Sequence, residues 1–314
     1  MPKTASPRSD QVHPVTDPYL SCTLCPRRCG VDRTNGQRGY CHADDHMRIG
    51  RAALHFWEEP CISGTGGSGA VFFSGCNLGC VFCQNHRISH TSASLPPGKE
   101  VSVEELVDIF FRLKDEGAHN INLVTADIYL PSVAEAISLA RSRGLDLPFV
   151  WNSSAYLNVE SLRLLDGLID IYLPDDKFYS PESAGKYSHA SDYPAAARLA
   201  IAEMVRQCSP CVFNKKGILQ RGVIVRHLLM PGGLLEAKLI LRDLYHTYGD
   251  TVYISLLHQY TPLMPQLEGF PELQRRVSGR EYDSLVSYAL RLGITNAYIQ
   301  EGDTASEEFI PEFL

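Results

Sequence analysis

The chain has 314 residues with an ordinary globular balance, 44% hydrophobic and 21% charged, so it is long enough to bury a substantial core. Its formal net charge of −7 argues against a nucleic-acid partner bound by bulk charge, and no apolar run approaches the ~20 residues that span a bilayer. Ten cysteines without a signal peptide argue against a disulfide framework, so we expect a cytoplasmic protein whose reduced thiols serve metals.

The amino-terminal part of the chain divides into a tail and a cysteine-rich segment. Residues 1–18 are polar and lack periodicity, so we expect a mobile tail. Residues 19–60 form the N-terminal cysteine segment, whose candidate metal ligands are Cys22, Cys25, Cys29 and Cys41. A tight turn predicted at Asn35-Gly36 folds Cys41 back towards the other three. Four thiolates can close a tetrahedral zinc site or ligate an auxiliary iron–sulfur cluster, and the sequence leaves this choice open.

Four arginines lie among these cysteines, at positions 27, 28, 33 and 38. We expect their charge to lower the pKa values of the thiols and to offset the negative charge of a four-thiolate site. The alternative is four unligated cysteines in a loop. A short segment with so little apolar material favours the metal site.

A second group of cysteines follows the apolar run 70–75. Cys76, Cys80 and Cys83 have Cys-x3-Cys-x2-Cys spacing, and we call residues 76–83 the three-cysteine loop. Three thiolates can hold three irons of a [4Fe–4S] cluster and leave the fourth iron free to bind a small molecule and pass it an electron. The alternatives are half of a zinc site, completed by a residue such as His86, or a chance grouping. Zinc motifs usually consist of two separated Cys-x2-Cys pairs, so the spacing favours the cluster.

From residue 70 onwards, short apolar runs alternate with amphipathic helices, as in βα units around a parallel sheet. The predicted strands are residues 70–75, 121–125, 149–151, 169–173, 222–229 and 252–257, with an edge strand at 296–300. Predicted helices start at capping boxes at Ser102 and Ser278 and at an Asp192 cap, and others cover 133–143 and 158–165. Six βα units are too few for a closed eight-stranded barrel.

Residues 69–85 resemble the signature loop of radical S-adenosylmethionine (SAM) enzymes. More narrowly, they resemble uncharacterised proteins related to pyruvate formate-lyase-activating enzyme, and the likeness extends from about Cys22 to the carboxyl end. The resemblance implies an α/β fold with a partial open (β/α)6 barrel over residues 61–314, with which the count of βα units agrees. It also implies a [4Fe–4S] cluster and SAM as cofactors.

Ligands of parallel βα folds bind at the carboxyl ends of strands, so polar residues there are candidates for the cofactor site. These candidates are Asn152, Asp175, Lys177, Arg226 and His258. Carboxylate, cationic and imidazole groups complement the amino, carboxylate, ribose and adenine parts of SAM. In the family that the chain resembles, residues matching the last four contact or neighbour SAM. Any one of them alone is as well explained as a solvated loop residue or a cap.

Two features do not fit this scheme. Radical SAM proteins often carry Gly-Gly-Glu-like residues after the second strand, where this chain has Thr125-Ala126-Asp127. Asp127 can replace the acid, but the glycines are missing. The remaining cysteines, Cys61, Cys208 and Cys211, have no obvious further ligand, so we interpret them as structural or incidental.

The sequence therefore predicts a radical SAM enzyme that receives one electron from a flavodoxin-like or ferredoxin-like donor, cleaves SAM and abstracts hydrogen from a substrate. By resemblance, the substrate is a backbone glycine of a partner enzyme. One rival is modification of a peptide or small molecule, with an auxiliary cluster in the N-terminal cysteine segment. The other is an iron–sulfur electron carrier or a zinc-stapled binding protein without SAM chemistry.

Overall fold

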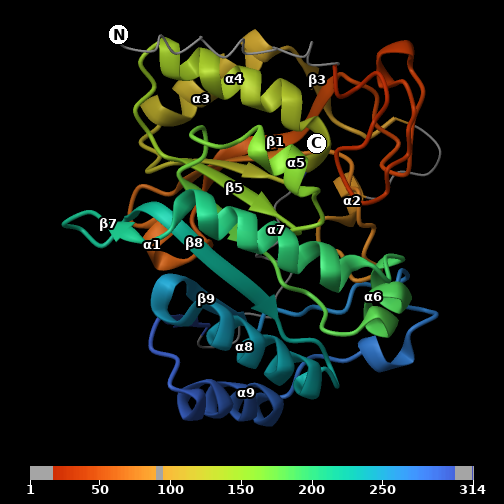
Figure 1. The fold of residues 1–314 in the computed structure, drawn as a ribbon, viewed down its shortest axis with the longest axis vertical. Helices are drawn as coiled ribbons and strands as arrows, with labels where there is room; N and C mark the ends of the chain where they lie inside the picture. The colour runs from red at the N-terminus through yellow and green to blue at the C-terminus, as the bar shows by residue number, and fades with distance from the viewer. Residues whose placement is uncertain (1–16, 90–94, 301–312, 314) are drawn as a thin grey trace, which may run out of the picture.

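Within residues 17–89 and 95–300, seven parallel strands form the centre of the fold, and helices lie against them (Figure 1). The computed structural model describes these residues and Phe313, so most of the expected tail at 1–18 lies outside the described residues. In spatial order the parallel strands are β2 (Ser68–Phe73), β4 (Ile121–Val124), β5 (Phe149–Ser153), β6 (Ile171–Pro174), β8 (Leu219–Leu228), β9 (Tyr253–Leu257) and β10 (Ala297–Ile299).

Shorter antiparallel additions flank this sheet. β1 (Met47–His55) pairs antiparallel with β2, and β3 (Lys99–Val101) pairs antiparallel with β1. β7 (Val212–Phe213) pairs with β8 near its start. The outermost strands of the described sheet are β10 and β3, so the sheet curves without closing.

Helices connect the parallel strands in the βα pattern. They are α1 (Pro60–Ser63), α2 (His86–Ser89), α3 (Val103–Asp115), α4 (Leu130–Ser142), α5 (Val159–Arg163), α6 (Pro181–Ser188), α7 (Tyr193–Cys208), α8 (Leu234–Tyr248) and α9 (Gly279–Leu292). None of the described helices is long and apolar enough to cross a membrane.

Alternation along β2 separates the two faces of the sheet. Val71 and Phe73 belong to the large core shared with the helices, whereas Ala70 and Phe72 belong to a smaller cluster on the opposite face. Successive side chains of a strand point to opposite faces, and both faces of β2 are buried. A strand that is covered on both faces has a continuous run of apolar residues in its sequence, and for this reason the sequence predicts β2 well.

The predicted fold class is confirmed: an α/β fold with a partial open barrel, with cysteines near the amino terminus. The six predicted strands correspond to β2, β4, β5, β6, β8 and β9, and the predicted edge strand is β10. β1 was not predicted, although it lies within the stretch assigned to the N-terminal cysteine segment. Asp192 does precede α7, but its side chain makes no capping hydrogen bond and instead accepts one from the Tyr156 hydroxyl at 2.7 Å.

The capping box that begins α3 gives a direct test of local stability. Ser102 Oγ accepts from the Glu105 amide at 3.2 Å, and the Glu105 carboxylate accepts from the Ser102 amide at 2.9 Å. We expect Ser102→Ala to lower the free energy of unfolding by about 1 kcal/mol, measured by urea unfolding of the metal-free chain. Ser138→Ala in the exposed interior of α4 is the control, because its hydroxyl only bonds back to Ala134. Equal effects of the two substitutions would contradict this role for the box.

Candidate active site

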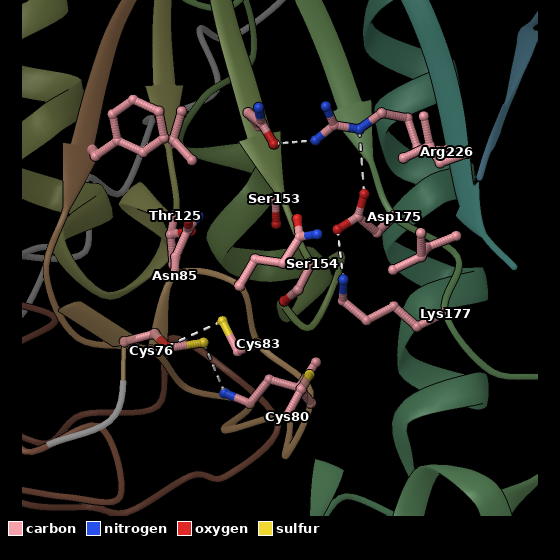
Figure 2. A pocket seen from close by; sticks show the side chains of 18 of the residues that line it. Cys76, Cys80, Cys83, Asn85, Thr125, Ser153, Ser154, Asp175, Lys177 and Arg226 are labelled. Carbon is pink, nitrogen blue, oxygen red and sulfur yellow. Dashed lines mark hydrogen bonds and ion pairs between the residues drawn. The ribbon is translucent and has the colours of Figure 1, made fainter. Parts of the chain in front are cut away.

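A cavity of about 240 Å³ opens where the parallel strands end. It is lined by residues at or just after the carboxyl ends of β1, β2, β4, β5, β6, β8 and β9. Figure 2 shows the three cysteines gathered at one part of this cavity and the charged residues Asp175, Lys177 and Arg226 at another. The fold therefore brings thiols and ion pairs from distant parts of the sequence into one space.

The three-cysteine loop leaves β2 through glycines that adopt left-handed backbone conformations. Gly75 has φ +91° and Gly79 has φ +73°, values that side chains rarely tolerate. A Cβ on Gly75 would lie 2.8 Å from Ile128 Cδ1, so this glycine also permits close packing beneath the loop. The sequence places glycines where the chain must turn tightly around its cysteines.

Each sulfur of the loop accepts a hydrogen bond. The Ser188 hydroxyl donates to Cys80 Sγ at 2.9 Å, and the Ser89 hydroxyl donates to Cys83 Sγ at 3.2 Å. The Leu78 amide donates to Cys76 Sγ at 3.3 Å. Hydrogen bonds to sulfur stabilise thiolates and tune the potential of a bound iron–sulfur cluster.

Burial keeps these thiols protonated in the absence of metal. It raises the pKa of Cys76 to about 12 and that of Cys80 to about 11, although the Lys177 ammonium acts in the opposite direction on Cys80. Burial also raises the pKa of Cys83. Metal ligation requires thiolates, so loading this site releases protons.

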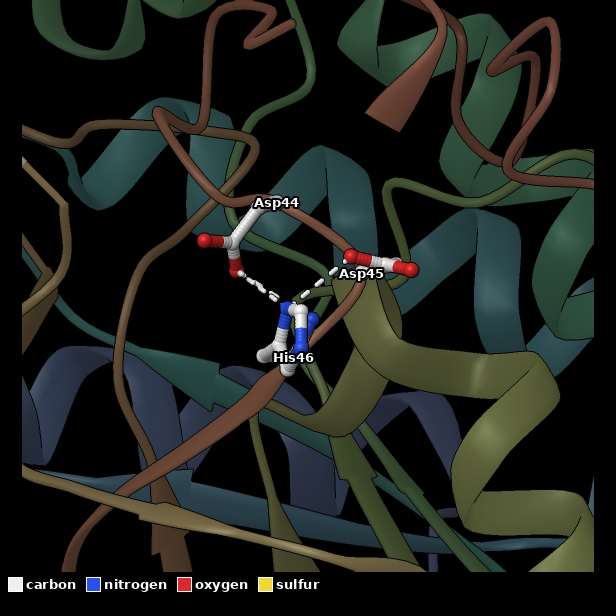
Figure 3. A group of neighbouring side chains, drawn as sticks. All are labelled: Asp44, Asp45 and His46. Carbon is white, nitrogen blue, oxygen red and sulfur yellow. Dashed lines mark hydrogen bonds and ion pairs between the residues drawn. The ribbon is translucent and has the colours of Figure 1, made fainter. Parts of the chain in front are cut away.

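The donor set of the loop fits a cluster better than a single zinc ion. Among the described residues, only Asp44, Asp45 and His46 bring three ligand atoms within 4.8 Å of one another (Figure 3). The three loop sulfurs are therefore not all within 4.8 Å, whereas zinc–sulfur bonds of ~2.3 Å place tetrahedral ligands only ~3.8 Å apart. His86, the alternative fourth zinc ligand, does not line the cavity.

The group in Figure 3 lies on the surface. The His46 ring is exposed and lies 3.0 Å from Asp45, while Asp44 already pairs with Arg48 at 3.6 Å. We do not interpret this group as a binding site.

Opposite the thiols, the charged residues form a continuous, largely buried network, in which the Asp175 side chain is the most exposed at 25%. Asp175 Oδ2 lies 2.6 Å from Lys177 Nζ, and Asp175 Oδ1 lies 3.2 Å from Arg226 Nε. Arg226 extends to Asn152 Oδ1 and to Glu58 Oε2, the latter at 2.9 Å. Burial alone would raise the pKa of Asp175, but Lys177 and Arg226 hold it below its ordinary value.

Glu58 is a member of this network that sequence reasoning missed. It follows β1 and also accepts hydrogen bonds from Asn122 Nδ2 at 2.9 Å and Asn152 Nδ2 at 3.3 Å. Its side chain is only 9% exposed, so its charge is compensated inside the protein rather than by water. In the sequence, only one weak feature marks Glu58: it is an acidic residue close to Pro60, in a stretch where no strand was predicted.

One predicted cofactor contact, His258, does not line the cavity, and neither does Asp127, the residue that could replace the missing acid. Both sequence neighbours of His258 line the cavity, but its own ring stacks on Tyr282 with centroids 4.4 Å apart. Asp127 turns away as well, and its carboxylate accepts from Trp151 Nε1 and Ser153 Oγ, each at 2.8 Å. The other four predicted cofactor contacts, Asn152, Asp175, Lys177 and Arg226, line the cavity, and their contact with a cofactor stays a prediction.

A family model described as the radical SAM superfamily matches residues 70–230, just over half of the chain. This chain belongs to the radical SAM superfamily. The family implies a [4Fe–4S] cluster and SAM, and the matched residues contain the three-cysteine loop, Asp175, Lys177 and Arg226.

Relatives extend the likeness without naming a substrate. An uncharacterized protein of Methanocaldococcus jannaschii is 28% identical over 285 residues, which cover 89% of this chain and 77% of that protein. A second uncharacterized protein of the same organism is 23% identical over 170 residues, covering 48% of each chain. The structure of HydG, a maturase of the [FeFe]-hydrogenase, aligns with a TM-score of 0.50 at 16% identity. That alignment covers 75% of this chain and 52% of HydG, so this chain spans about half of that protein, and the likeness shows the fold alone.

The N-terminal cysteine segment of this radical SAM protein gathers its four thiols around a small enclosed space of about 20 Å³. Arg33 lies beside it, 1% exposed, donating to the carbonyls of Asp44 and Ile128 and lying 4.0 Å from Cys22 Sγ. For Cys25 and Cys41, burial outweighs the expected lowering of the thiol pKa by the arginines. Burial raises the pKa of Cys25 to about 12 and also raises that of Cys41, despite Arg33.

The remaining cysteines lie elsewhere. Cys208 is buried and donates to the Ile169 carbonyl at 3.3 Å. Cys61 and Cys211 pack in a small apolar cluster beneath the sheet, away from both cysteine groups. These surroundings are those of structural thiols.

Asp127 should make stability depend on pH. Burial raises its pKa to about 7, compared with 3.8 for an unperturbed aspartate, so the native state holds this proton more tightly than the unfolded state. Unfolding therefore releases the proton between about pH 4 and 7, and the free energy of unfolding falls as pH rises through that window. We expect Asp127→Asn to remove the contribution of Asp127 to this fall, worth ~1.4 kcal/mol per pKa unit, in urea unfolding of the metal-free chain at several pH values, while Asp176, whose pKa burial also raises to about 7, keeps its own contribution. Asp108→Asn on the exposed face of α3 is the control, and identical pH profiles for the two variants would refute the assignment.

The Glu58–Arg226 pair should be strongly coupled. Because both side chains are mostly buried, Arg226→Gln leaves Glu58 without its cation and leaves Asp175 with Lys177 alone, and we expect a loss of about 3–5 kcal/mol of unfolding free energy. Adding Glu58→Gln to the same chain should recover part of that loss.

The matched comparison is the exposed pair Arg112–Glu116, 2.6 Å apart on and just after α3, for which a double-mutant cycle should give only ~0.3–0.5 kcal/mol. A Glu58–Arg226 coupling as small as that of the surface pair would show that the buried network is not a stabilising unit.

Proposed function

We propose that this chain is a radical SAM enzyme that holds a [4Fe–4S] cluster through Cys76, Cys80 and Cys83 and binds SAM beside it. The observation that carries the proposal is the presence of the three thiols and a buried ion-pair network in one cavity. When bound, the cluster and SAM supply a 5′-deoxyadenosyl radical, formed with methionine by one-electron cleavage, which takes a hydrogen atom from the substrate.

The side chains of the cavity have separate roles in this proposal. Asp175 receives the amino group of SAM, because its carboxylate pairs with Lys177 at 2.6 Å and lines the same cavity as the thiols. Lys177 and Arg226 attract the carboxylate of SAM, and Asn152 offers amide hydrogen bonds to its ribose. Glu58 fixes the guanidinium of Arg226 from behind. His258 is left out of this set, since its ring is held against Tyr282.

Apolar side chains complete the wall and exclude water. Phe72, Phe82, Leu228 and Met230 line the same cavity as the ion pairs. A dry, fixed surrounding strengthens the electrostatic interactions and protects a reactive species from solvent.

The proposal includes a second metal centre and external partners. Cys22, Cys25, Cys29 and Cys41 hold that centre, and a flavodoxin-like or ferredoxin-like protein supplies the electron. The substrate class follows from resemblance: a backbone glycine of a partner enzyme, as for glycyl-radical activases, or else another peptide or a small molecule.

Reconstituted protein should test the proposal directly. With iron and sulfide restored under anaerobic conditions, we expect SAM and dithionite to yield 5′-deoxyadenosine and methionine, measured by liquid chromatography. Cys80→Ala should abolish this release, because three thiolates are needed to hold the cluster. Cys208→Ala is the control thiol and should retain activity, since Cys208 lies outside the cavity. Fully iron-loaded wild-type protein that releases no 5′-deoxyadenosine would favour an electron carrier.

A further inference from the structure

The N-terminal cysteine segment touches the three-cysteine loop through one arginine. Arg27 lies between Cys25 and Cys29 in the sequence, and its guanidinium donates to two backbone carbonyls of the loop. Nε reaches the Asn77 carbonyl at 3.1 Å and Nη2 reaches the Leu78 carbonyl at 3.2 Å. Charged donors make stronger hydrogen bonds than neutral ones, so Arg27 restrains the backbone between Cys76 and Cys80.

The same guanidinium reaches a group that supports a loop sulfur. It donates to the carbonyls of His189 at 2.6 Å and Ser188 at 3.3 Å, at the end of α6. Ser188 Oγ in turn donates to Cys80 Sγ at 2.9 Å. Arg27 therefore ties together the loop and the hydroxyl that serves its sulfur.

Tyr40 holds Arg27 in place and makes a second connection. The guanidinium lies 3.7 Å from the centroid of the Tyr40 ring, a cation–π contact, and the Tyr40 hydroxyl donates to the Leu78 carbonyl at 3.3 Å. At its other end, the Tyr40 amide donates to Cys29 Sγ at 3.4 Å. One residue thus bonds both a thiol of the N-terminal cysteine segment and the backbone of the three-cysteine loop.

Glycines allow the two segments to approach so closely. A Cβ on Gly79 of the loop would lie 2.8 Å from the Tyr40 hydroxyl, and a Cβ on Gly39 would lie 2.6 Å from Cys29 Sγ. Such contacts leave little room for one segment to move without the other.

The chemistry of the second centre follows from the spacing of its thiols. Like the three-cysteine loop, the group Cys22, Cys25, Cys29 and Cys41 has no three sulfurs within 4.8 Å of one another in the described chain. Tetrahedral zinc with ~2.3 Å bonds would need ~3.8 Å between sulfurs. Neither cysteine group therefore has the close sulfur spacing of a preformed tetrahedral zinc site, which favours a larger metal–sulfide core.

We propose that the N-terminal cysteines bind an iron–sulfur cluster that anchors Arg27 and Tyr40, and through them fixes the three-cysteine loop. The inference rests on the proposed function, because it takes the loop as the holder of the SAM-binding cluster. Arg27 is a positioning residue: it acts on the backbone and on Ser188, not on substrate.

The metal is tested in a chain whose loop cluster has been removed. In the triple variant Cys76→Ala, Cys80→Ala and Cys83→Ala, we expect about four irons and four sulfides per chain and no zinc. One zinc without sulfide would overturn the iron–sulfur assignment. This measurement does not involve SAM cleavage, so it stands whether or not the proposed function fails.

The anchor is tested with Arg27→Gln against Arg28→Gln, which makes the same change of charge at an exposed neighbouring residue. In the loaded protein, we expect hydrogen exchange of amides 76–83 to accelerate about tenfold in Arg27→Gln and to remain unchanged in Arg28→Gln. Arg27→Lys should restore part of the protection, and the electron paramagnetic resonance spectrum of the reduced loop cluster should change in Arg27→Gln alone.

Should Arg27→Gln fail to fold, Tyr40→Phe removes only the hydroxyl bond to Leu78 and should accelerate the same amides to a smaller extent. Wild-type exchange rates and spectra in both Arg27→Gln and Tyr40→Phe would refute the anchor. Absence of 5′-deoxyadenosine from the wild type would refute the proposed function instead.

Discussion

The arrangement of the cavity wall depends on the carboxylates that compensate the positive charge of Arg226. A guanidinium inside a barrel is costly unless carboxylates surround it, and here Asp175 and Glu58 do so from opposite directions. Asp175 comes from the strand end where ligands of parallel sheets bind, whereas Glu58 comes from the connection between β1 and α1. The network therefore fixes the wall opposite the thiols before any ligand arrives, so polar groups need little reorganisation to receive one.

Local spacing and strand position made much of this site predictable. The three cysteines lie within eight consecutive residues, so their proximity follows from the chain itself, and Asp175 and Lys177 follow a buried apolar run. Glu58 was beyond reach because its partner Arg226 is 168 residues away and because β1 joins the sheet antiparallel, which an expectation of pure βα units does not include.

The position of His258 outside the cavity lining has a different explanation. Side chains alternate near the end of a strand, and the cavity receives Leu257 and Gln259, so the residue between them points elsewhere. The pattern of apolar residues predicts where the strand ends. It does not predict which of the alternating side chains at that end face the ligand. Asp127 illustrates the competing principle that a buried acid takes the nearest donors, in this case Trp151 and Ser153.

The antiparallel strand β1 sets the limits of any excised catalytic piece. The region that defines the family begins at residue 70, yet β2 is paired with β1 along its length, and the carboxylate of Glu58 enters from the same stretch. A fragment that begins at residue 70 would lack β1 and expose the unpaired edge of β2. It would also leave the Arg226 guanidinium without one of its two carboxylate partners, Glu58. The smallest independently folding unit of this protein should therefore start no later than Met47.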